Sequence, residues 1–165
     1  MKELKSEFFT LRELTRSATA TRLGIDNTPS DEIIDNLQLL CDRVLDPLRG
    51  RWWLGPIRVS SGYRCPRLNR VVGGAMGSLH MSGLAADITS LYDTPLINKS
   101  LLSCLLRSNL PFHKVIIEKP DEEMCPDWIH VQYVKTDNPR RIVRVYDGHG
   151  YRPLTTGERK LLGLN

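Results

Sequence analysis

Apolar residues recur at helical spacing between positions 33 and 48, and they form the longest periodic pattern in the chain. Thr28 can cap a helix there, and Pro29 suits its first turn. Pro47 lacks the amide hydrogen that an interior helical position donates, so we expect it to bend or end the helix. The pattern predicts a long amphipathic helix that packs one face on a core.

Shorter patterns predict further helices and several strands. Thr10 and Glu13 have the spacing of a capping box, and Gly24 is placed to end the helix that they begin. Alternating or β-branched apolar residues predict strands at residues 57–60, 84–88, 115–117, 129–134 and 142–146. The other expected elements are a short helix after Pro66, a leucine-rich helix from Thr94 to near Asn109, and a helical turn within residues 155–164.

The order of these elements indicates the fold class. Helices and strands are mixed without the regular alternation that builds a doubly wound parallel sheet. We therefore expect an α+β fold in which a small antiparallel sheet is flanked by helices. A length of 165 residues and a hydrophobic share of 41% suit a single domain over residues 1–165 with one sizeable core.

Composition and charge narrow the function only slightly. Charged residues make up 25% of the chain, which argues against disorder, and the net charge of +4 comes from scattered lysines and arginines. A mildly basic surface suits either plain solvation or attraction to an anionic polymer, and nucleic acid and the bacterial wall both qualify. The chain has no G-x-x-x-x-G-K pattern for phosphate binding. Charge alone does not choose between these partners.

The N-terminus and the cysteines bear on the location of the protein. The opening MKELKSEFFTLREL carries acidic residues where a secretory signal needs an apolar run. No apolar stretch reaches the roughly 20 residues of a membrane-spanning helix. The four cysteines lie far apart without a C-x-x-C pair, so we expect free thiols. We expect cytoplasmic synthesis, no membrane insertion and a monomer.

The candidate chemistry lies in the segment SLHMSGLAAD and in the later DWIH. His80 and Asp87 stand seven positions apart, and His130 lies on the strand predicted at 129–134. A turn at Ser82–Gly83 can bring the chain back, so that His80 and Asp87 approach one point while His130 enters from an adjacent strand. Two imidazoles and one carboxylate are the ligands of a catalytic zinc ion, which keeps a further position for water. We therefore predict one zinc ion held by His80, Asp87 and His130.

Two more residues suit peptide hydrolysis at such a metal. Zinc lowers the pKa of a coordinated water to about 7, and a carboxylate is still needed to take the proton and pass it to the leaving amine. Asp127, three residues before His130, is the candidate general base. Arg64, at the end of the SGYR turn, is the candidate for stabilising negative charge on the attacked carbonyl oxygen.

Each assignment has a structural alternative. A histidine is more often a surface or hydrogen-bonded residue than a ligand, and His113 and His149 keep that interpretation. Asp127 can be a turn residue, and Arg64 can bind backbone carbonyls. Asp87 is different, because a charge inside an apolar strand is costly unless it is paired or bound to a metal.

The segments SSGYRCPRLNRVVGGAMGSLHMSGLAADI and DWIHV together resemble the M15 peptidases, especially the D-Ala-D-Ala carboxypeptidase branch that includes phage endolysins. The resemblance spans about residues 57–134, and the opening FFTLRELTRSATA also looks like small members of this branch. It implies the fold that these peptidases share with the Hedgehog signalling domain. That fold is a small antiparallel sheet flanked by helices, with one zinc ion.

The family patterns S-x-H-x-x-G-x-A-x-D and W-x-H imply roles for single residues. Their histidines and aspartate fall on the three zinc ligands named above. Asp127 falls on the catalytic base, where many relatives have glutamate and endolysin-like members have aspartate. Arg64 falls on the arginine that polarises the substrate carbonyl. Ser78 matches the motif serine, which implies a part in substrate binding.

The leading hypothesis is hydrolysis of a peptide bond in the stem peptide of bacterial peptidoglycan. Family members cut either the terminal D-Ala-D-Ala bond or the L-Ala-D-Glu bond inside the stem, and both stay open here. The alternative from a different class is a zinc-stabilised cell-wall-binding domain without turnover, since Hedgehog domains keep the metal without known peptidase action. A nucleic-acid-binding module rests on charge alone, so we expect no nucleic-acid partner. The enzyme would act at the cell wall once released from the cytoplasm.

Overall fold

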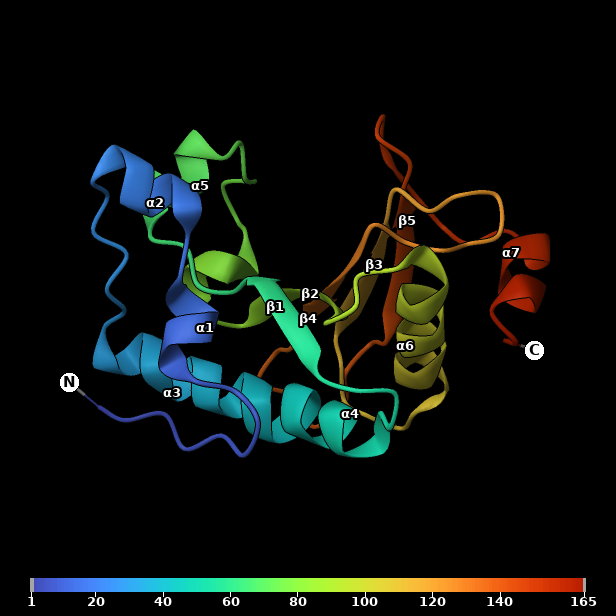
Figure 1. The fold of residues 1–165 in the computed structure, drawn as a ribbon, viewed down its shortest axis with the longest axis horizontal. Helices are drawn as coiled ribbons and strands as arrows, with labels where there is room; N and C mark the ends of the chain where they lie inside the picture. The colour runs from blue at the N-terminus through green and yellow to red at the C-terminus, as the bar shows by residue number, and fades with distance from the viewer. Residues whose placement is uncertain (1, 165) are drawn as a thin grey trace.

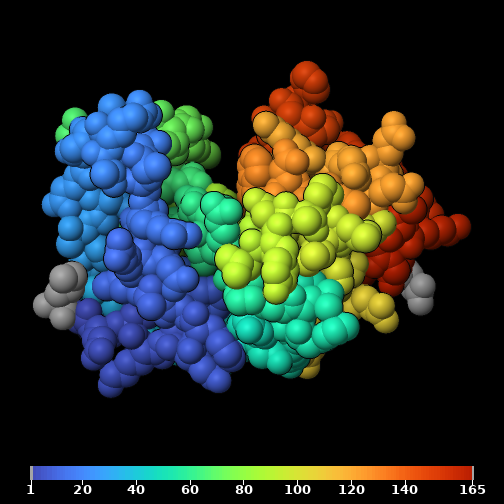
Figure 2. Space-filling view, in the orientation of Figure 1, coloured from blue at the N-terminus to red at the C-terminus, as the bar shows by residue number. Residues whose placement is uncertain are grey.

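The computed structural model describes residues 2–164, which form helices around one sheet (Figure 1). The helices are α1 (Leu11–Thr15), α2 (Ala18–Leu23), α3 (Asp31–Leu40), the π-helical η1 (Cys41–Leu45), α4 (Asp46–Arg51), α5 (Pro66–Val71), the 3₁₀ turn η2 (Leu79–Ser82), α6 (Pro95–Arg107) and α7 (Thr156–Leu161). The strands are β1 (Ile57–Ser61), β2 (Ala85–Ser90), β3 (Lys114–Glu118), β4 (Trp128–Gln132), β5 (Ile142–Tyr146) and β6 (Tyr151–Arg152). The first and last parts of the chain lie at opposite ends of the molecule (Figures 1 and 2). Within residues 2–164, no helix has the length and apolar character needed to cross a membrane.

The sheet confirms the predicted α+β class. Its strand order is β1-β2-β4-β3-β5-β6, and every neighbouring pair is antiparallel except β3 and β5. The parallel pair arises because the chain leaves β4, crosses to the other edge of β3 and then runs in the direction of β3. The five predicted strands are confirmed as β1 to β5, with each end within two residues of its predicted position.

The single N-terminal helix predicted between Thr10 and Gly24 is wrong, because the chain forms two helices there. The capping box of Thr10 and Glu13 begins α1, and Gly24 ends α2 with a φ of +57°, both as expected. Arg16 is extended between them. The Ser17 hydroxyl then accepts a backbone hydrogen bond and begins α2. A second cap thus divides one predicted helix into two.

The long helix begins later than predicted and continues past Pro47. The Ser30 hydroxyl caps α3, whereas the amide of Thr28 donates to the Asp26 carboxylate in a turn before the helix. The helical path runs through α3, η1 and α4 along one side of the molecule (Figure 1). The wider π-helical turn just before Pro47 accommodates its ring and its missing amide hydrogen.

Strand alternation divides the sheet into a core face and an open face. Buried apolar residues of β2, β3 and β4 pack with α3, η1, α4 and α6 in one cluster, among them Ala86, Ile88, Val115, Ile117, Ile129 and Val131. Their neighbours along each strand therefore point to the other face, which includes Asp87 and His130. The four cysteines are free thiols as predicted. The core thus decides which polar side chains share the open face.

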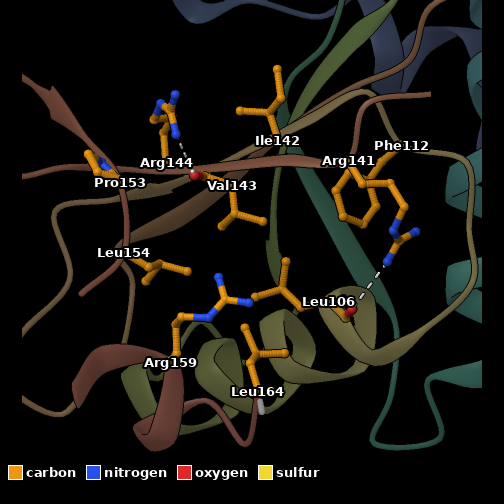
Figure 3. Close-up of a pocket in the computed structure, with 10 residues that line it drawn as sticks. All are labelled: Leu106, Phe112, Arg141, Ile142, Val143, Arg144, Pro153, Leu154, Arg159 and Leu164. Carbon is orange, nitrogen blue, oxygen red and sulfur yellow. Dashed lines mark hydrogen bonds between the residues drawn. The ribbon is translucent and has the colours of Figure 1, made fainter. Parts of the chain in front are cut away.

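Arg141 fixes the end of α6 and the start of β5. Its guanidinium donates to the carbonyl oxygens of Leu106, Ser108 and Leu110, and it lies 4.1 Å from the centre of the Phe112 ring. Figure 3 shows the hydrogen bond to Leu106 and the neighbouring Phe112 ring. A hollow of about 390 Å³ lies beside Arg141, among α6, β5 and α7. The residues of the described chain that line it include no carboxylate, imidazole or thiol, so it offers no ligand set for a metal.

Arg152 and Glu158 join β6 to α7. Arg152 donates to both Glu158 oxygens, at 2.6 and 2.8 Å, and the Thr155 amide donates to the same carboxylate at 2.8 Å. The hydrogen bond from Arg152 is the main reason why the pKa of Glu158 is lowered from 4.5 to about 2. The folded chain therefore keeps Glu158 ionised at pH values where the unfolded chain protonates it.

We expect Glu158→Gln to lower the free energy of unfolding at pH 7 by about 1 kcal/mol, a small value because Arg152 is partly exposed. Since the pKa of Glu158 is lowered in the folded state, its contribution is present above pH 4.5 and is lost as the pH falls toward 2. Urea unfolding of the wild type and of Glu158→Gln across this pH range measures how the difference between their free energies of unfolding decreases as the pH falls. Glu122→Gln, at an exposed glutamate, is the matched control. A stability difference that does not change with pH would contradict the pairing.

Candidate metal centre

Two adjacent strands place a carboxylate and an imidazole opposite each other. In the antiparallel register of β2 and β4, Asp87 lies directly across from His130. Cβ atoms of directly opposed residues lie about 4.5–5.5 Å apart, so these side chains meet. His80 comes from η2, the turn before β2. Gly83 ends that turn with a φ of +68°, a conformation that glycine adopts without strain.

The three side chains converge on one point. His80 Nε2 lies 3.2 Å from His130 Nδ1 and 3.3 Å from Asp87 Oδ2. His130 Nδ1 lies 2.7 Å from Asp87 Oδ1. Zinc bonds of about 2.0–2.1 Å at tetrahedral angles hold two ligand atoms about 3.3 Å apart. The structure thus brings together the residues singled out by sequence spacing, and their donor atoms fit one metal ion of this size.

Hydrogen bonds outside this cluster orient both imidazole rings. His80 Nδ1 lies 2.6 Å from the carbonyl oxygen of Gly62, so Nδ1 is the donor and the lone pair of Nε2 faces the cluster. His130 Nε2 lies 2.9 Å from the side-chain amide nitrogen of Gln132. When Nδ1 of His130 is a ligand, Nε2 carries the hydrogen, and rotation of the Gln132 amide presents an oxygen to accept it.

Gly62 can hold its carbonyl in this place because it has no side chain. A Cβ at this position would lie 2.2 Å from the backbone oxygen of Leu14 in α1. The amide of Tyr63 donates to the same oxygen at 2.7 Å. Gly62 therefore allows the backbone of α1 to pack directly against the segment whose carbonyl orients His80.

Arg64 reaches the cluster from the same SGYR segment. Its Nη2 donates to Asp87 Oδ2 at 2.7 Å and lies 3.3 Å from His80 Nε2, while its Nε donates to the Ser61 hydroxyl at 2.8 Å. Burial raises the pKa of Asp87, but hydrogen bonds from His130 and His80 outweigh burial, and the pKa falls below its ordinary value. Asp87 is therefore ionised at neutral pH, as a metal ligand must be.

The cluster lines an open cavity of about 730 Å³, a size that admits a short peptide. Figure 2 shows a notch between the green segment around α5 and the orange and red segment around β5. One wall is the loop of residues 72–78 after α5, where Ser78 is half-buried. The floor comes from β4 and β3, and the opposite wall comes from β5 and β6.

Side chains cross the floor of the cavity in two rows. The first row is Asp87, His130, Ile116 and Arg144, on β2, β4, β3 and β5. The second row is Trp128, Glu118, Tyr146 and Tyr151, on β4, β3, β5 and β6. The ring centres of Tyr146 and Tyr151 lie 5.0 Å apart. The first row therefore runs from the cluster to the guanidinium of Arg144. The second row runs from Trp128 and the Glu118 carboxylate to two tyrosine rings that are tilted against each other.

Asp127 lies away from the cavity. It is exposed and lies in a bend directly before β4, which begins at Trp128. Asn98 of α6 donates to its carbonyl oxygen at 3.4 Å. Within residues 2–164, its carboxylate accepts no hydrogen bond and does not line the cavity. The structure brings Arg64 to the three ligand candidates but not Asp127, whose role as general base stays a prediction.

Glu118 is a cavity residue that sequence reasoning did not single out. It is the last residue of β3 and is 8% exposed. Burial raises the pKa of Glu118, His130 opposes this shift and Asp87 adds to it. The signal in the sequence is weak, since it consists only of a glutamate directly after the apolar run of a predicted strand.

Comparison with known proteins agrees with this geometry. A family model described as Peptidase M15 matches residues 7–131, more than half of the chain. The matched segment contains Arg64 and the cluster of His80, Asp87 and His130. No curated protein matches the chain. The cavity wall formed by β5 and β6 lies after the matched residues.

We expect His80→Ala to lower zinc affinity by more than about 100-fold, because even an outer-shell partner of a ligand contributes about 10–100-fold. Metal content after dialysis and a competition titration with a chromogenic chelator measure the loss. His149→Ala removes an exposed imidazole between β5 and β6 and should leave one zinc ion per chain. Equal zinc binding by His80→Ala and the wild type would exclude this metal centre.

Proposed function

Because this chain belongs to the Peptidase M15 family, we propose that it is a zinc peptidase that hydrolyses a peptide bond in the stem peptide of bacterial peptidoglycan. The observation that carries the proposal is the cluster of His80, Asp87 and His130, which lines an open cavity within the family-matched segment. The bond is either the terminal D-Ala-D-Ala bond or the L-Ala-D-Glu bond inside the stem.

The cluster would hold zinc through His80 Nε2, His130 Nδ1 and an oxygen of Asp87. Two imidazoles and a carboxylate also suit ferrous iron, and the family match is the reason for preferring zinc. A zinc ion in such a site supplies a Lewis acid and lowers the pKa of a coordinated water to about 7. The Gly62 carbonyl already orients the His80 ring, and rotation of the Gln132 amide would let its oxygen accept the hydrogen bond from His130 Nε2.

Arg64 is placed to act on the substrate carbonyl. Its guanidinium lines the cavity beside Asp87, where it can donate to a carbonyl oxygen that gains negative charge during attack. Ser78, on the loop wall, is placed to hydrogen-bond the substrate backbone. Hydrolysis also needs a carboxylate that transfers a proton. Two carboxylates compete for this role, Asp127 from the family pattern and Glu118 from its position in the cavity.

The wall formed by β5 and β6 suits an acidic peptide. Lys114 and Arg144 add positive charge to the cavity, and Tyr146 and Tyr151 form an aromatic surface in the neighbouring row. Both candidate bonds lie beside a carboxylate, either the C-terminus of D-Ala-D-Ala or that of the glutamate. Arg144 lies two strands from His130 in the same row, about 10 Å away. Arg144 is therefore placed to bind a substrate carboxylate while the scissile bond lies at the cluster.

Zinc-loaded protein should release D-alanine or stem-peptide fragments from peptidoglycan, and mass spectrometry of the fragments identifies the bond. A chelator should abolish the release and added zinc should restore it, because the cluster then regains its ion. Walls of different stem chemistry should be compared in parallel. If the protein binds one zinc ion per chain but releases no fragments from any wall, the peptidase function is refuted and a zinc-stabilised wall-binding domain is favoured.

Arg144→Gln should raise KM about tenfold and keep kcat within about twofold, since it removes one charge-assisted contact worth roughly 1.4 kcal/mol. Steady-state kinetics on a defined muropeptide measure the effect. The same peptide with its carboxylate blocked as an amide should show little difference between the variant and the wild type. Arg140→Gln, at an exposed arginine outside the cavity lining, is the matched control. An unchanged KM in Arg144→Gln would refute carboxylate binding by this residue.

A further inference from the structure

Trp53 is the most exposed tryptophan of the chain and lies just after α4. Its exposed fraction is 84%, whereas the preceding Trp52 is 2% exposed and packs in the core. Arg49 donates to the carbonyl oxygen of Trp52 at 2.9 Å and so fixes the backbone at this point. An exposed indole on a fixed backbone is typical of binding surfaces, because it offers a large, flat apolar area at little entropic cost.

Trp53 lines a groove between the end of α4 and the outer side of α6. Two adjoining hollows of about 610 and 460 Å³ form this groove, and Ser100 and Ser103 line both of them. Figure 2 shows the teal segment around α4 directly against the yellow-green segment that includes the start of α6. Trp53 lies in the first hollow and the exposed Leu96 in the second. The groove is therefore long and open, with one large apolar side chain in each hollow.

Most other side chains of the groove are polar, and several are positively charged. They supply hydroxyl groups, an amide and three cations, from Ser100, Ser103, Ser108, Asn109, Arg51, Arg107 and Lys99. None of the described residues that line the groove has a carboxylate. The groove therefore suits an anionic ligand that also forms many hydrogen bonds.

A buried hydrogen-bond donor beside the groove lacks an acceptor. Trp52 lines the first hollow, and within residues 2–164 its Nε1–H makes no hydrogen bond. Leaving a buried donor unpaired is costly, and each such group in a folded protein needs an explanation. A ligand that brings an oxygen into this hollow supplies one.

A polysaccharide fits these features better than a peptide does. A sugar ring has an apolar C–H face that stacks on an indole, and its hydroxyl groups bond to polar side chains. An extended peptide instead needs unpaired backbone groups, such as those at the edge of a sheet. The groove is lined by α6, whose backbone groups are bonded within the helix, and by the loop after α4. Side chains are therefore the main partners that it offers.

The groove lies apart from the metal centre. Residues of α4 and α6 pack on the core face of the sheet, whereas the cluster lies on the open face. Within the described chain, no residue lines both the groove and the cavity. A ligand in the groove therefore leaves the cavity free for a substrate.

We propose, on the basis of the function above, that this groove is a second site that binds the glycan strand of peptidoglycan. Trp53 stacks on a sugar ring, while the serines and Asn109 bond to its hydroxyl and acetamido groups. The three cations face the carboxylates that the wall carries. The groove attaches the protein to the wall, and the cavity acts on the stem peptides.

Binding to glycan strands tests this site without turnover. The probe is soluble strands freed of their stem peptides, and the protein is the full chain kept metal-free with a chelator. We expect Trp53→Ala to weaken binding at least tenfold, because the stacking ring is lost, and Trp53→Phe to keep most of the affinity. Leu23→Ala, at an exposed leucine of α2 outside the groove, is the matched control. Isothermal titration calorimetry measures the affinities.

Ser100 allows a separate test of the charge of the groove. Ser100→Glu places a carboxylate among the three cations, so it should weaken strand binding more than Ser100→Gln, which has nearly the same shape. Ser100 is exposed on α6, and glutamate and glutamine both suit a helix. The difference between the two variants should decrease as salt is added.

The zinc-loaded variants separate attachment from chemistry. Trp53→Ala should hydrolyse a soluble muropeptide at the wild-type rate and release fragments more slowly from insoluble peptidoglycan, because only its attachment is weakened. Thermal unfolding checks that each variant keeps its fold.

The glycan site is refuted if the wild type and Trp53→Ala bind the strands with equal affinity. It is also refuted if free stem peptides displace the strands, which places the strands in the cavity. If Trp53→Ala instead changes only self-association in sedimentation, or only binding of single-stranded DNA, the groove belongs to another partner. Failure of the peptidase function gives a different result, because the zinc-loaded wild type then releases nothing from any wall while its strand binding is unaffected.

Discussion

The pairing of β2 with β4 is the constraint on which the rest of the structure depends. Their register sets Asp87 opposite His130 on the open face while Ile88 and Ile129 pack together on the core face. Because side chains alternate along a strand, a slip of one residue would move the ligands into the core and the apolar residues into the cavity. The hydrophobic core therefore fixes the geometry of the metal centre.

Asp87 is the costly group in this arrangement, because an ionised carboxylate is buried there. Two histidines and Arg64 surround it, and they come from three separate segments of the chain. Partner groups outside the cluster, the Gly62 carbonyl and the Gln132 amide, then fix the imidazole rings. The SGYR segment, η2 and β4 are therefore held together at Asp87, because each of them contributes a side chain that compensates its charge.

The fold class and the ligand cluster could be predicted because both leave local signals. Alternation marks the strands, and the seven-residue spacing of His80 and Asp87 needs only a turn and a strand. Caps were harder to place, since Ser17 and Ser30 compete with nearby residues that also suit the start of a helix. Such choices depend on packing that the sequence does not display.

The positions of the carboxylates other than Asp87 could not be predicted from the sequence, for a different reason. Asp127 lies in a bend directly before β4, so neither a helical nor a strand period in the sequence gives the direction of its side chain. Glu118 lies twelve residues before His130, and only the pairing of β3 with β4 brings the two together. No local motif records that pairing, so its consequence became visible only in the folded sheet.

The hairpin of β5 and β6 joins the sheet through the backbone ladder of β3 and β5, which does not depend on the identity of the cavity side chains. The family-matched residues end at 131, before this hairpin begins. Under the proposed function, the part that performs the chemistry and the part that reads the substrate are therefore separate stretches of sequence. Substitutions at Arg144, Tyr146 and Tyr151 offer a route to retarget the enzyme from one wall chemistry to another while its metal centre stays intact.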